Sequence, residues 1–430
     1  MFKNFKMKIE NFGIINHADL DISKINIIAG KNSSGKTTIS KLLYCFITSF
    51  SIDGENLTFE SMKDRIDFRI NDLFHIFQED NEILNKITQI RLKLESTNKS
   101  QLTIIHEVYE ELENLINSID FENKEILLEM LENDKHLIGI INPSDFYLYL
   151  IKNEFSGDEE ILNNFNNSQI TIYNDLENPF DYSIRITDGI GILSNKKLKN
   201  MSFNREAIYI ETPYFLDYRI PFAQASIYGQ KPYHQFLLYQ KLMDQSSKND
   251  ILDEFENKKT IEFERKLNSI IEGKFKIDNS GLFKFKQNSK EFSLANTSTG
   301  IKTIGMIQIL LENRKLHKNS YLIMDEPEVH LHPEWQIKLA EILVLLVKEL
   351  GVTLFLNSHS PLFIEAMEVY STKYETKNDT RLFLTEKNKE NDKYDIIEIP
   401  FKKIYELYDN LGNPYDTLDI IRGENIANNR

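Results

Sequence analysis

The octapeptide GKNSSGKT at residues 30–37 constrains the fold more than any other stretch of this sequence. The apolar segment KINIIA precedes it and predicts a buried strand, and residues 37–50 have the apolar spacing of a helix. Gly30 and Gly35 allow the backbone to turn tightly with its amide groups pointing inward. A strand, a glycine-rich loop and a helix in this order form a cradle for phosphate groups, because the helix N-terminus adds positive charge.

This phosphate loop predicts a site for ATP and Mg²⁺. Lys36 has the position from which a lysine reaches the β and γ phosphates, and Thr37 has the position from which a hydroxyl contacts Mg²⁺. The predicted nucleotide-binding residues of the loop are Gly30, Lys31, Asn32, Ser33, Ser34, Gly35, Lys36, Thr37 and Thr38.

A second apolar stretch, SYLIMDEP, ends in two carboxylates. We expect Asp325 to hold Mg²⁺, directly or through water, and Glu326 to polarise the attacking water as a general base. A metal site that includes the nearby His330 and His332 is disfavoured, because no further ligand stands at a suitable spacing. Pro333 indicates that a helix starts there, so a structural or dimer-contact role is the better interpretation of these histidines.

The segment TLFLNSHSP predicts another buried strand with His359 at its end. We expect His359 to contact the γ-phosphate or the water that attacks it. A hydrolase dyad of Ser358 and His359 is disfavoured, because no Gly-x-Ser-x-Gly turn presents the serine.

A short turn before a helix predicts a second anion-binding site. Its residues are Ser298, Thr299 and Gly300, and the helix N-terminus that follows them would attract phosphate. Because this turn lies just upstream of the Asp-Glu strand, we expect it to receive ATP from a partner subunit across a dimer interface.

Buried apolar strands that alternate with helices predict an α/β fold with a mostly parallel sheet. Residues rich in Glu, Lys, Asn, Leu and Ile interrupt this pattern and predict a helical insertion. The expected segments are an N-terminal core lobe at 1–55, the helical insertion at 56–165, core strands and a helical segment at 166–272, the core with Asp325 and His359 at 273–370, and a C-terminal extension of the core at 371–430.

The formal net charge of −15 argues against nonspecific coating of nucleic acid, because phosphate contacts need clustered Lys and Arg. A local basic groove remains open. Cys45 is the single cysteine and excludes an intramolecular disulfide or a CxxC metal knuckle. The sequence has no secretory signal and no stretch of ~20 apolar residues, so we expect a cytoplasmic protein without membrane contact.

Taken together, these segments resemble the ABC-type ATPase superfamily in its SMC-, RecF- and OLD-like branch. GKNSSGKT resembles its Walker A motif, LIMDEPEVHLHPEWQ its Walker B motif and following loop, NSHSP its switch-histidine segment, and TSTGIK occupies the signature position. The resemblance implies an ABC-ATPase head, a P-loop fold with a mixed or parallel sheet flanked by helices, that hydrolyses ATP to ADP and phosphate.

The same resemblance implies a homodimer or a higher even-numbered oligomer. Two ATP molecules would lie between the heads, each between Walker A of one chain and Ser298, Thr299 and Gly300 of the other. Three departures matter. The signature is not LSGGQ, and Glu10 stands where an Arg often precedes Asn-Phe. No glutamine is assigned to the Q-loop, because Gln78 and Gln101 lie in the helical insertion.

OLD-family proteins carry a C-terminal Toprim nuclease, and the stretch after His359 is too short to hold one. We therefore expect the effector, a nuclease or toxin, to be a separate chain. This narrows the resemblance to stand-alone antiphage defence ATPases such as AriA of the PARIS system and PtuA of the Septu system. In that reading the ATPase holds or releases its effector in response to phage, with a phage protein as a candidate trigger.

Two alternatives stay open. An SMC- or RecF-like ATPase in DNA repair would clamp DNA directly and needs a basic path between the heads. The candidates for such a path are Lys196, Lys197, Lys199 and Arg205, and a solvated loop is the better interpretation of these residues. A transporter ATPase is disfavoured by the helical insertion, the missing LSGGQ and the segment DEPEVHLHP.

Overall fold

Most of the strands that the structure describes join one large sheet. The computed structural model describes residues 5–51, parts of 62–80, 81–94, 101–121, 124–138, 143–155, 167–174, 180–187, 190–193, 205–212, 233–244, 254–271, 273–277, 283–287, 290–293, 299–409 and 411. The strands of the large sheet are β1 (Phe5–Phe12), β2 (Ile15–Ile22), β3 (Ile25–Ala29), β4 (Ser168–Asn174), β5 (Phe180–Thr187), β6 (Ile190–Leu193), β7 (Glu206–Ile210), β11 (Ser320–Asp325), β12 (Thr353–Ser358), β13 (Thr380–Lys387) and β14 (Tyr394–Glu398).

This sheet is mixed, with the strand order β6-β5-β4-β1-β2-β14-β13-β3-β12-β11-β7. Strands β13, β3, β12, β11 and β7 are parallel neighbours, and β14 is parallel to β2. The pairs β1–β2, β1–β4, β4–β5, β5–β6 and β13–β14 are antiparallel. The expectation of a mostly parallel sheet therefore holds only for the half that carries the phosphate loop. Short connections join the antiparallel pairs β1–β2, β4–β5, β5–β6 and β13–β14, whereas a parallel pair needs a long crossover.

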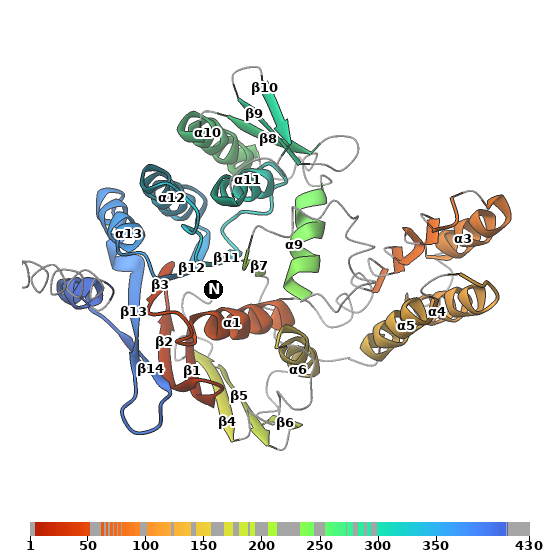
Figure 1. The fold of residues 1–430 in the computed structure, drawn as a ribbon, viewed down its shortest axis with the longest axis horizontal. Coiled ribbons are helices and arrows are strands. Elements are labelled where there is room, and N and C mark those ends of the chain that lie inside the picture. Colours follow the sequence, from red (N-terminus) through yellow and green to blue (C-terminus); the bar gives the residue numbers. More distant parts are fainter. Residues whose placement is uncertain are drawn as a thin grey trace, which may run out of the picture.

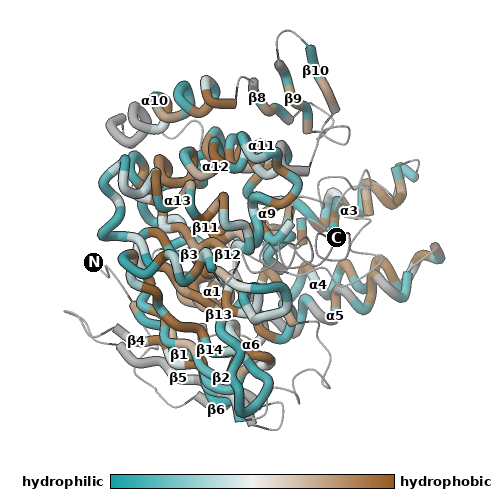
Figure 2. The backbone as a smooth tube through the Cα atoms, turned by 60° about the vertical axis from the view of Figure 1, so that its left-hand side comes forward, coloured by the Kyte–Doolittle hydropathy of each residue, from teal (hydrophilic) through white to brown (hydrophobic). Residues whose placement is uncertain are grey.

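Two apolar cores lie on opposite faces of this sheet (Figures 1 and 2). Strand β3 shows how the sequence divides between them. Ile25, Ile27 and Ala29 belong to one core, and Ile28 belongs to the other. Because successive side chains of a strand point to opposite faces, the unbroken apolar run of β3 is buried on both sides.

Helices cover both faces. One core packs against α1 (Lys36–Phe50) and α6 (Pro143–Glu154), which contact each other. The other core packs against α9 (Tyr233–Met243), α10 (Glu254–Ile271), α11 (Thr299–Glu312), α12 (Pro333–Leu345) and α13 (Pro361–Lys373). The short helical turns are η5 (Leu346–Leu350), η6 (Lys377–Asp379) and η7 (Phe401–Lys403). The helical segment that begins with α12 ends at Gly351, with a π-helical last turn and a left-handed Gly351 at φ 72°.

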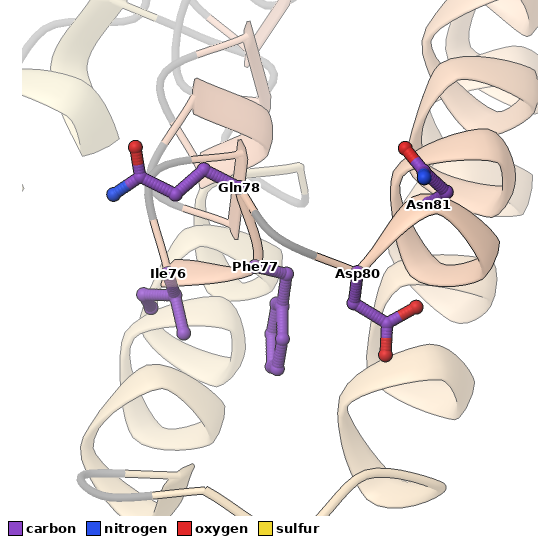
Figure 3. Close-up of a pocket in the computed structure, with 5 residues that line it drawn as sticks. All are labelled: Ile76, Phe77, Gln78, Asp80 and Asn81. Atoms are coloured by element: carbon purple, nitrogen blue, oxygen red, sulfur yellow. The ribbon is translucent and has the colours of Figure 1, made fainter.

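Three helices extend away from the sheet (Figure 1). They are α3 (Asn81–Lys93), α4 (Gln101–Asn117) and α5 (Lys124–Ile138), and they share an apolar core of their own. A shallow pocket at the start of α3 is lined by Ile76, Phe77, Gln78, Asp80 and Asn81 (Figure 3). The carboxylate of Asp80 in this pocket caps α3, because Asp80 Oδ1 accepts hydrogen bonds from the backbone amides of residues 82 and 83.

A second sheet has the strand order β10-β9-β8 and packs beside α11. Its strands are β8 (Lys274–Ile277), β9 (Phe283–Gln287) and β10 (Lys290–Ser293). Strands β8 and β9 are antiparallel, and residues 278–282 between them lie outside the described residues. Phe275 fits against Gly305 of α11, where a Cβ would lie 2.5 Å from the Phe275 ring. No helix in the described part of the chain is long and apolar enough to cross a membrane.

Candidate functional site

The phosphate loop connects β3 to α1, as the strand–loop–helix pattern predicts. Ser33 and Gly35 have left-handed φ values of 59° and 94°, so the backbone curls between Gly30 and α1. Neither glycine has room for a side chain. A Cβ on Gly30 would lie 1.9 Å from Thr385 Oγ1, and a Cβ on Gly35 would lie 2.9 Å from Ile15 Cγ1. Neighbouring strands therefore hold the loop in its shape from both sides.

The lysine of this loop is buried at 5% exposure. Lys36 Nζ donates hydrogen bonds of 2.9 Å to the backbone carbonyls of Gly30 and Lys31, and it lies 3.8 Å from Glu326 Oε1. Burial lowers the pKa of Lys36, and the carboxylates that follow β11 oppose this effect. The two carbonyls thus hold the Lys36 ammonium inside the loop, where a phosphate oxygen can accept a hydrogen bond from it.

Asp325 ends β11 and is held by side chains from three other elements. Its Oδ2 accepts a hydrogen bond of 2.9 Å from the Tyr209 hydroxyl, and its Oδ1 accepts one of 2.6 Å from Asn357 Nδ2. Burial raises the pKa of Asp325, and hydrogen bonds from Thr37, Tyr209 and Ser40 offset part of that rise. Thr37 and Asp325 therefore lie together and offer the hydroxyl and carboxylate oxygens that Mg²⁺ prefers.

Glu326 and His359 face each other at the ends of the adjacent strands β11 and β12. Glu326 Oε1 lies 3.1 Å from His359 Nδ1, and Glu326 has a left-handed φ of 45°. This contact is the largest influence on both groups: it lowers the pKa of Glu326 and raises the pKa of His359. Both side chains remain partly exposed, so the carboxylate of Glu326 is charged and open to solvent near Lys36.

A third carboxylate ties the loop after β11 to β12. Glu328 is 2% exposed, and its Oε1 accepts a hydrogen bond of 2.5 Å from Ser358 Oγ. Burial raises the pKa of Glu328, and the Ser358 hydroxyl opposes that rise. Because the Ser358 hydroxyl donates to Glu328, it is engaged away from a dyad with His359.

The two histidines downstream of Asp325 have structural positions. His332 is the N-cap of α12, with Nδ1 accepting from the backbone amide of Glu334 at 3.4 Å, and Pro333 stands in the first turn. His330 has a left-handed φ of 63° in the turn before the helix. The described residues contain no group of three or more His, Cys, Asp or Glu that could hold a metal ion.

The predicted signature residues are only partly visible. Thr299 and Gly300 form the first turn of α11, and Ser298 lies outside the described residues. Of the candidate basic path, Lys196, Lys197 and Lys199 also lie outside them, and Arg205 Cζ lies 5.2 Å above the Tyr321 ring. Arg205 is therefore engaged with the sheet.

Sequence reasoning missed Tyr209, Asn357 and Ser40 as contacts of Asp325. Asn357 stood inside the segment TLFLNSHSP, and its place beside Asp325 follows from the parallel register of β11 and β12. Tyr209 comes from β7, the other neighbour of β11, and nothing in the local pattern of β7 marks it. Only the strand order could have found it.

These strands and loops define a class of protein. Three neighbouring parallel strands, β3, β12 and β11, bring the phosphate loop, His359 and the Asp-Glu pair to one edge of the sheet. Ligands bind outside the carboxyl ends of such strands. The fold is thus that of a P-loop nucleotide-binding protein, with a mixed α/β sheet flanked by helices.

The chain belongs to the AAA ATPase domain family, whose profile matches residues 5–364. Among curated proteins, none matches the chain. Distant likenesses among solved structures include the SMC head domain from Thermotoga maritima, at 10% identity and a TM-score of 0.40 over 93% of this chain and 99% of that one. Another is an SmcHead bound to the C-winged helix domain of ScpA, at 10% identity and a TM-score of 0.46 over 93% and 98%. A third is the Smc head domain from Pyrococcus furiosus, at 9% identity and a TM-score of 0.35 over 94% and 98%.

Proposed function

We propose that this chain binds ATP with Mg²⁺ and hydrolyses it to ADP and phosphate. The observation that carries the proposal is the meeting of Lys36, Thr37, Asp325, Glu326 and His359 at one edge of the sheet. Lys36 neutralises the β and γ phosphates, and the residues of the phosphate loop donate backbone amides to them. Thr37 and Asp325 hold Mg²⁺, which spreads the negative charge of the triphosphate.

Glu326 is the general base in this proposal. Its lowered pKa keeps the carboxylate charged at neutral pH, and its contact with His359 orients it toward the water that attacks the γ-phosphate. His359 contacts the γ-phosphate and reports its presence. The imidazole has a raised pKa beside Glu326, which favours the positive form near phosphate.

The test is Mg²⁺-dependent phosphate release by the purified protein and by Glu326→Gln. We expect the variant to bind ATP with unchanged affinity and to hydrolyse it at least about a hundredfold more slowly, as for loss of a general base. We also expect it to persist as an ATP-bound dimer, measured by mass photometry with and without EDTA. Normal turnover by Glu326→Gln would place the base elsewhere.

We further propose that two chains close around ATP and hold or release a separate effector in an antiphage defence complex. The support is the resemblance of the motifs to stand-alone ATPases such as AriA and PtuA, and the position of Thr299 and Gly300 in the first turn of α11. The partner chain's Ser298, Thr299 and Gly300 would complete the ATP site. ATP binding then shifts the population toward the closed dimer.

Co-purification tests this assignment. The tagged protein is isolated from its native host at moderate salt, with the Lys36→Ala variant as the matched control, and the partners are identified by mass spectrometry. A stoichiometric nuclease or toxin that is lost from Lys36→Ala supports the defence assignment. Recovery of the chain alone from both preparations contradicts it.

A second candidate function, direct DNA contact as in SMC- and RecF-like repair ATPases, is favoured by a basic surface. Strands β8 and β9 alternate Lys with apolar residues, so four lysines share the face that points away from Phe275 and Phe285. We call this surface the lysine face; it consists of Lys274, Lys276, Lys284 and Lys286.

The lysines of this face oppose one another directly. Lys274 stands across from Lys286, and Lys276 stands across from Lys284. Like charges in directly opposed positions destabilise a sheet. Uncharged polar residues at these four positions would avoid this loss of stability. Partial compensation comes from Glu291, across from Lys286, and from Glu312, 3.0 Å from Lys274. The positive charge of the lysine face suits the phosphate backbone of a nucleic acid, although the chain as a whole is acidic.

Fluorescence anisotropy with a labelled random-sequence DNA duplex tests this candidate. We expect Lys276→Glu/Lys286→Glu to weaken binding at least about tenfold, and to reduce the slope of log affinity against log salt by about two. The control Lys389→Glu/Lys402→Glu makes the same change in net charge at exposed positions elsewhere. Equal binding by both variants would exclude the lysine face as a DNA contact.

A further inference from the structure

A buried histidine contacts the tyrosine that donates to Asp325. His234 is in the first turn of α9 and is 1% exposed, and its ring centroid lies 4.5 Å from that of Tyr209. Tyr44 of α1 completes the cluster, with centroids 5.8 Å from Tyr209 and 6.0 Å from His234. Since all three rings are buried, the imidazole limits where the Tyr209 ring, and therefore its hydroxyl, can lie.

Charged groups hold the imidazole on both edges. His234 Nδ1 lies 2.5 Å from Glu154 Oε2, and the backbone amide of His234 donates to Glu154 Oε1 at 2.8 Å. On the other edge, His234 Nε2 lies 3.3 Å from Glu211 Oε2. Lys41 Nζ of α1 lies 3.1 Å from Glu211 Oε1. The ring is thus fixed by residues of α1, α6 and the end of β7 together.

The charges of this cluster balance only when the imidazole is protonated. Glu154 and Glu211 bring two negative charges, and Lys41 and the imidazolium bring two positive ones. Burial by itself lowers the pKa of His234, and the two carboxylates overcome this and raise it. A buried set of charges is costly to assemble and costly to break, so its geometry tolerates little change.

The cluster also lies at the end of the helical insertion, where the chain leads back to the large sheet. Helix α6 ends at Glu154 and packs on α1, and the helices α3 to α5 precede it in the chain. The contacts therefore run without interruption from Glu154 through His234 and Tyr209 to Asp325.

We infer that His234 is a positioning residue for the Mg²⁺ site. It holds the Tyr209 ring, whose hydroxyl keeps the Asp325 carboxylate in the orientation that the cation requires. Groups that orient a metal-binding carboxylate in this way change metal affinity without touching the metal. The inference rests on the proposed nucleotide function, in which Asp325 holds Mg²⁺.

The experiment measures the binding of a fluorescent ATP analogue as a function of Mg²⁺ concentration. Tyr209→Phe removes only the hydroxyl that donates to Asp325, and His234→Gln removes the imidazole. We expect each variant to raise the Mg²⁺ concentration at half-saturation about tenfold, with analogue binding in EDTA unchanged. In the double variant, the Mg²⁺ concentration at half-saturation should rise no further than in the more affected single variant. The reason is that His234 acts on Asp325 only through Tyr209.

Tyr44→Phe is the matched control. It removes the hydroxyl of another ring in the same cluster and leaves the four side chains that contact Asp325 in place, so we expect no shift in Mg²⁺ dependence. Thermal unfolding shows whether His234→Gln is folded, and Tyr209→Phe, which keeps its ring, provides the test if it is not. Unchanged Mg²⁺ dependence in Tyr209→Phe, or additive shifts in the double variant, would overturn the inference. Failure of the proposed nucleotide function would differ, because the unaltered protein would then bind no analogue at any Mg²⁺ concentration.

Discussion

The lysines of the phosphate loop and of the lysine face show how burial changes what one residue type does. Lys36 is 5% exposed and donates to two backbone carbonyls, with carboxylates nearby. Lys276 and Lys286 are exposed on a sheet face and stand across from other lysines. A buried charge acts through fixed geometry and is little screened by salt, whereas exposed charges act together over distance and are screened. The two regions therefore call for different experiments: single substitutions in the first and charge reversals with salt titrations in the second.

The strongest test of this comparison is Lys36→Ala. We expect no measurable ATP binding by isothermal titration calorimetry, because the variant lacks the ammonium that lies inside the loop and would neutralise the β and γ phosphates. Unlike DNA binding by the lysine face, this loss should not be recovered by lowering the salt concentration. Retained affinity in a folded Lys36→Ala variant would remove the phosphate-loop assignment.

The next effect concerns the buried charges beside Tyr209. Burial alone would raise the pKa of Glu211, but contacts with His234 and Lys41 lower it from 4.5 to about 2. A lowered folded pKa contributes stability above pH 4.5, and this contribution is lost as pH falls toward 2. We expect Glu211→Gln to lower the free energy of unfolding by about 3 kcal/mol at pH 7, following the size of the pKa shift.

Urea unfolding at several pH values measures this effect. The difference between Glu211→Gln and the unaltered protein should shrink as the pH falls below 4.5. His234 acts in the opposite sense, because its raised pKa contributes stability below 6.5 that is lost as pH rises through its folded value. The control Glu390→Gln, at an exposed turn, should change neither the free energy of unfolding nor its dependence on pH. A pH-independent difference for Glu211→Gln would contradict the charge pairing described here.

The smallest effect concerns the stability of the lysine face. Lys276→Glu replaces the like-charged pair of Lys276 and Lys284 by an opposite-charged pair. We expect stability to rise by about 0.2–1 kcal/mol, while the affinity for DNA falls. Thermal unfolding at low and high salt checks this, since the gain should fade with salt. A loss of stability at low salt would mean that the opposed lysines are not a cost to the fold.

Local patterns in the sequence predicted much of the site. The strand before Gly30, the tight loop and α1 all follow from residue types within a short window. The same is true of β11 with its terminal Asp325, and of α12, which begins at Pro333 after its His332 cap. Such elements are predictable because apolar spacing, glycine and proline act over a few residues.

Other features could not be predicted because they depend on which strands become neighbours. Strand β14 pairs with both β13 and β2, which joins the C-terminal part of the described chain to its N-terminal hairpin. Tyr209 contacts Asp325 only because β7 pairs with β11. Likewise, the alternation of apolar strands and helices predicted a mostly parallel sheet, and the antiparallel pairing of β4, β5 and β6 depends on the tertiary structure.

For this protein, then, the sequence by itself determined the phosphate loop, the Asp-Glu pair and the histidine that follows the next strand. Each is a contiguous segment whose local conformation is dictated by its own residues. The tertiary structure alone decided that His234 of α9 lies against Tyr209, between Glu154 of α6 and Glu211. Contacts between residues far apart in the chain are set by the packing of whole elements, and the side-chain volumes and buried charges that govern this packing come from several elements at once.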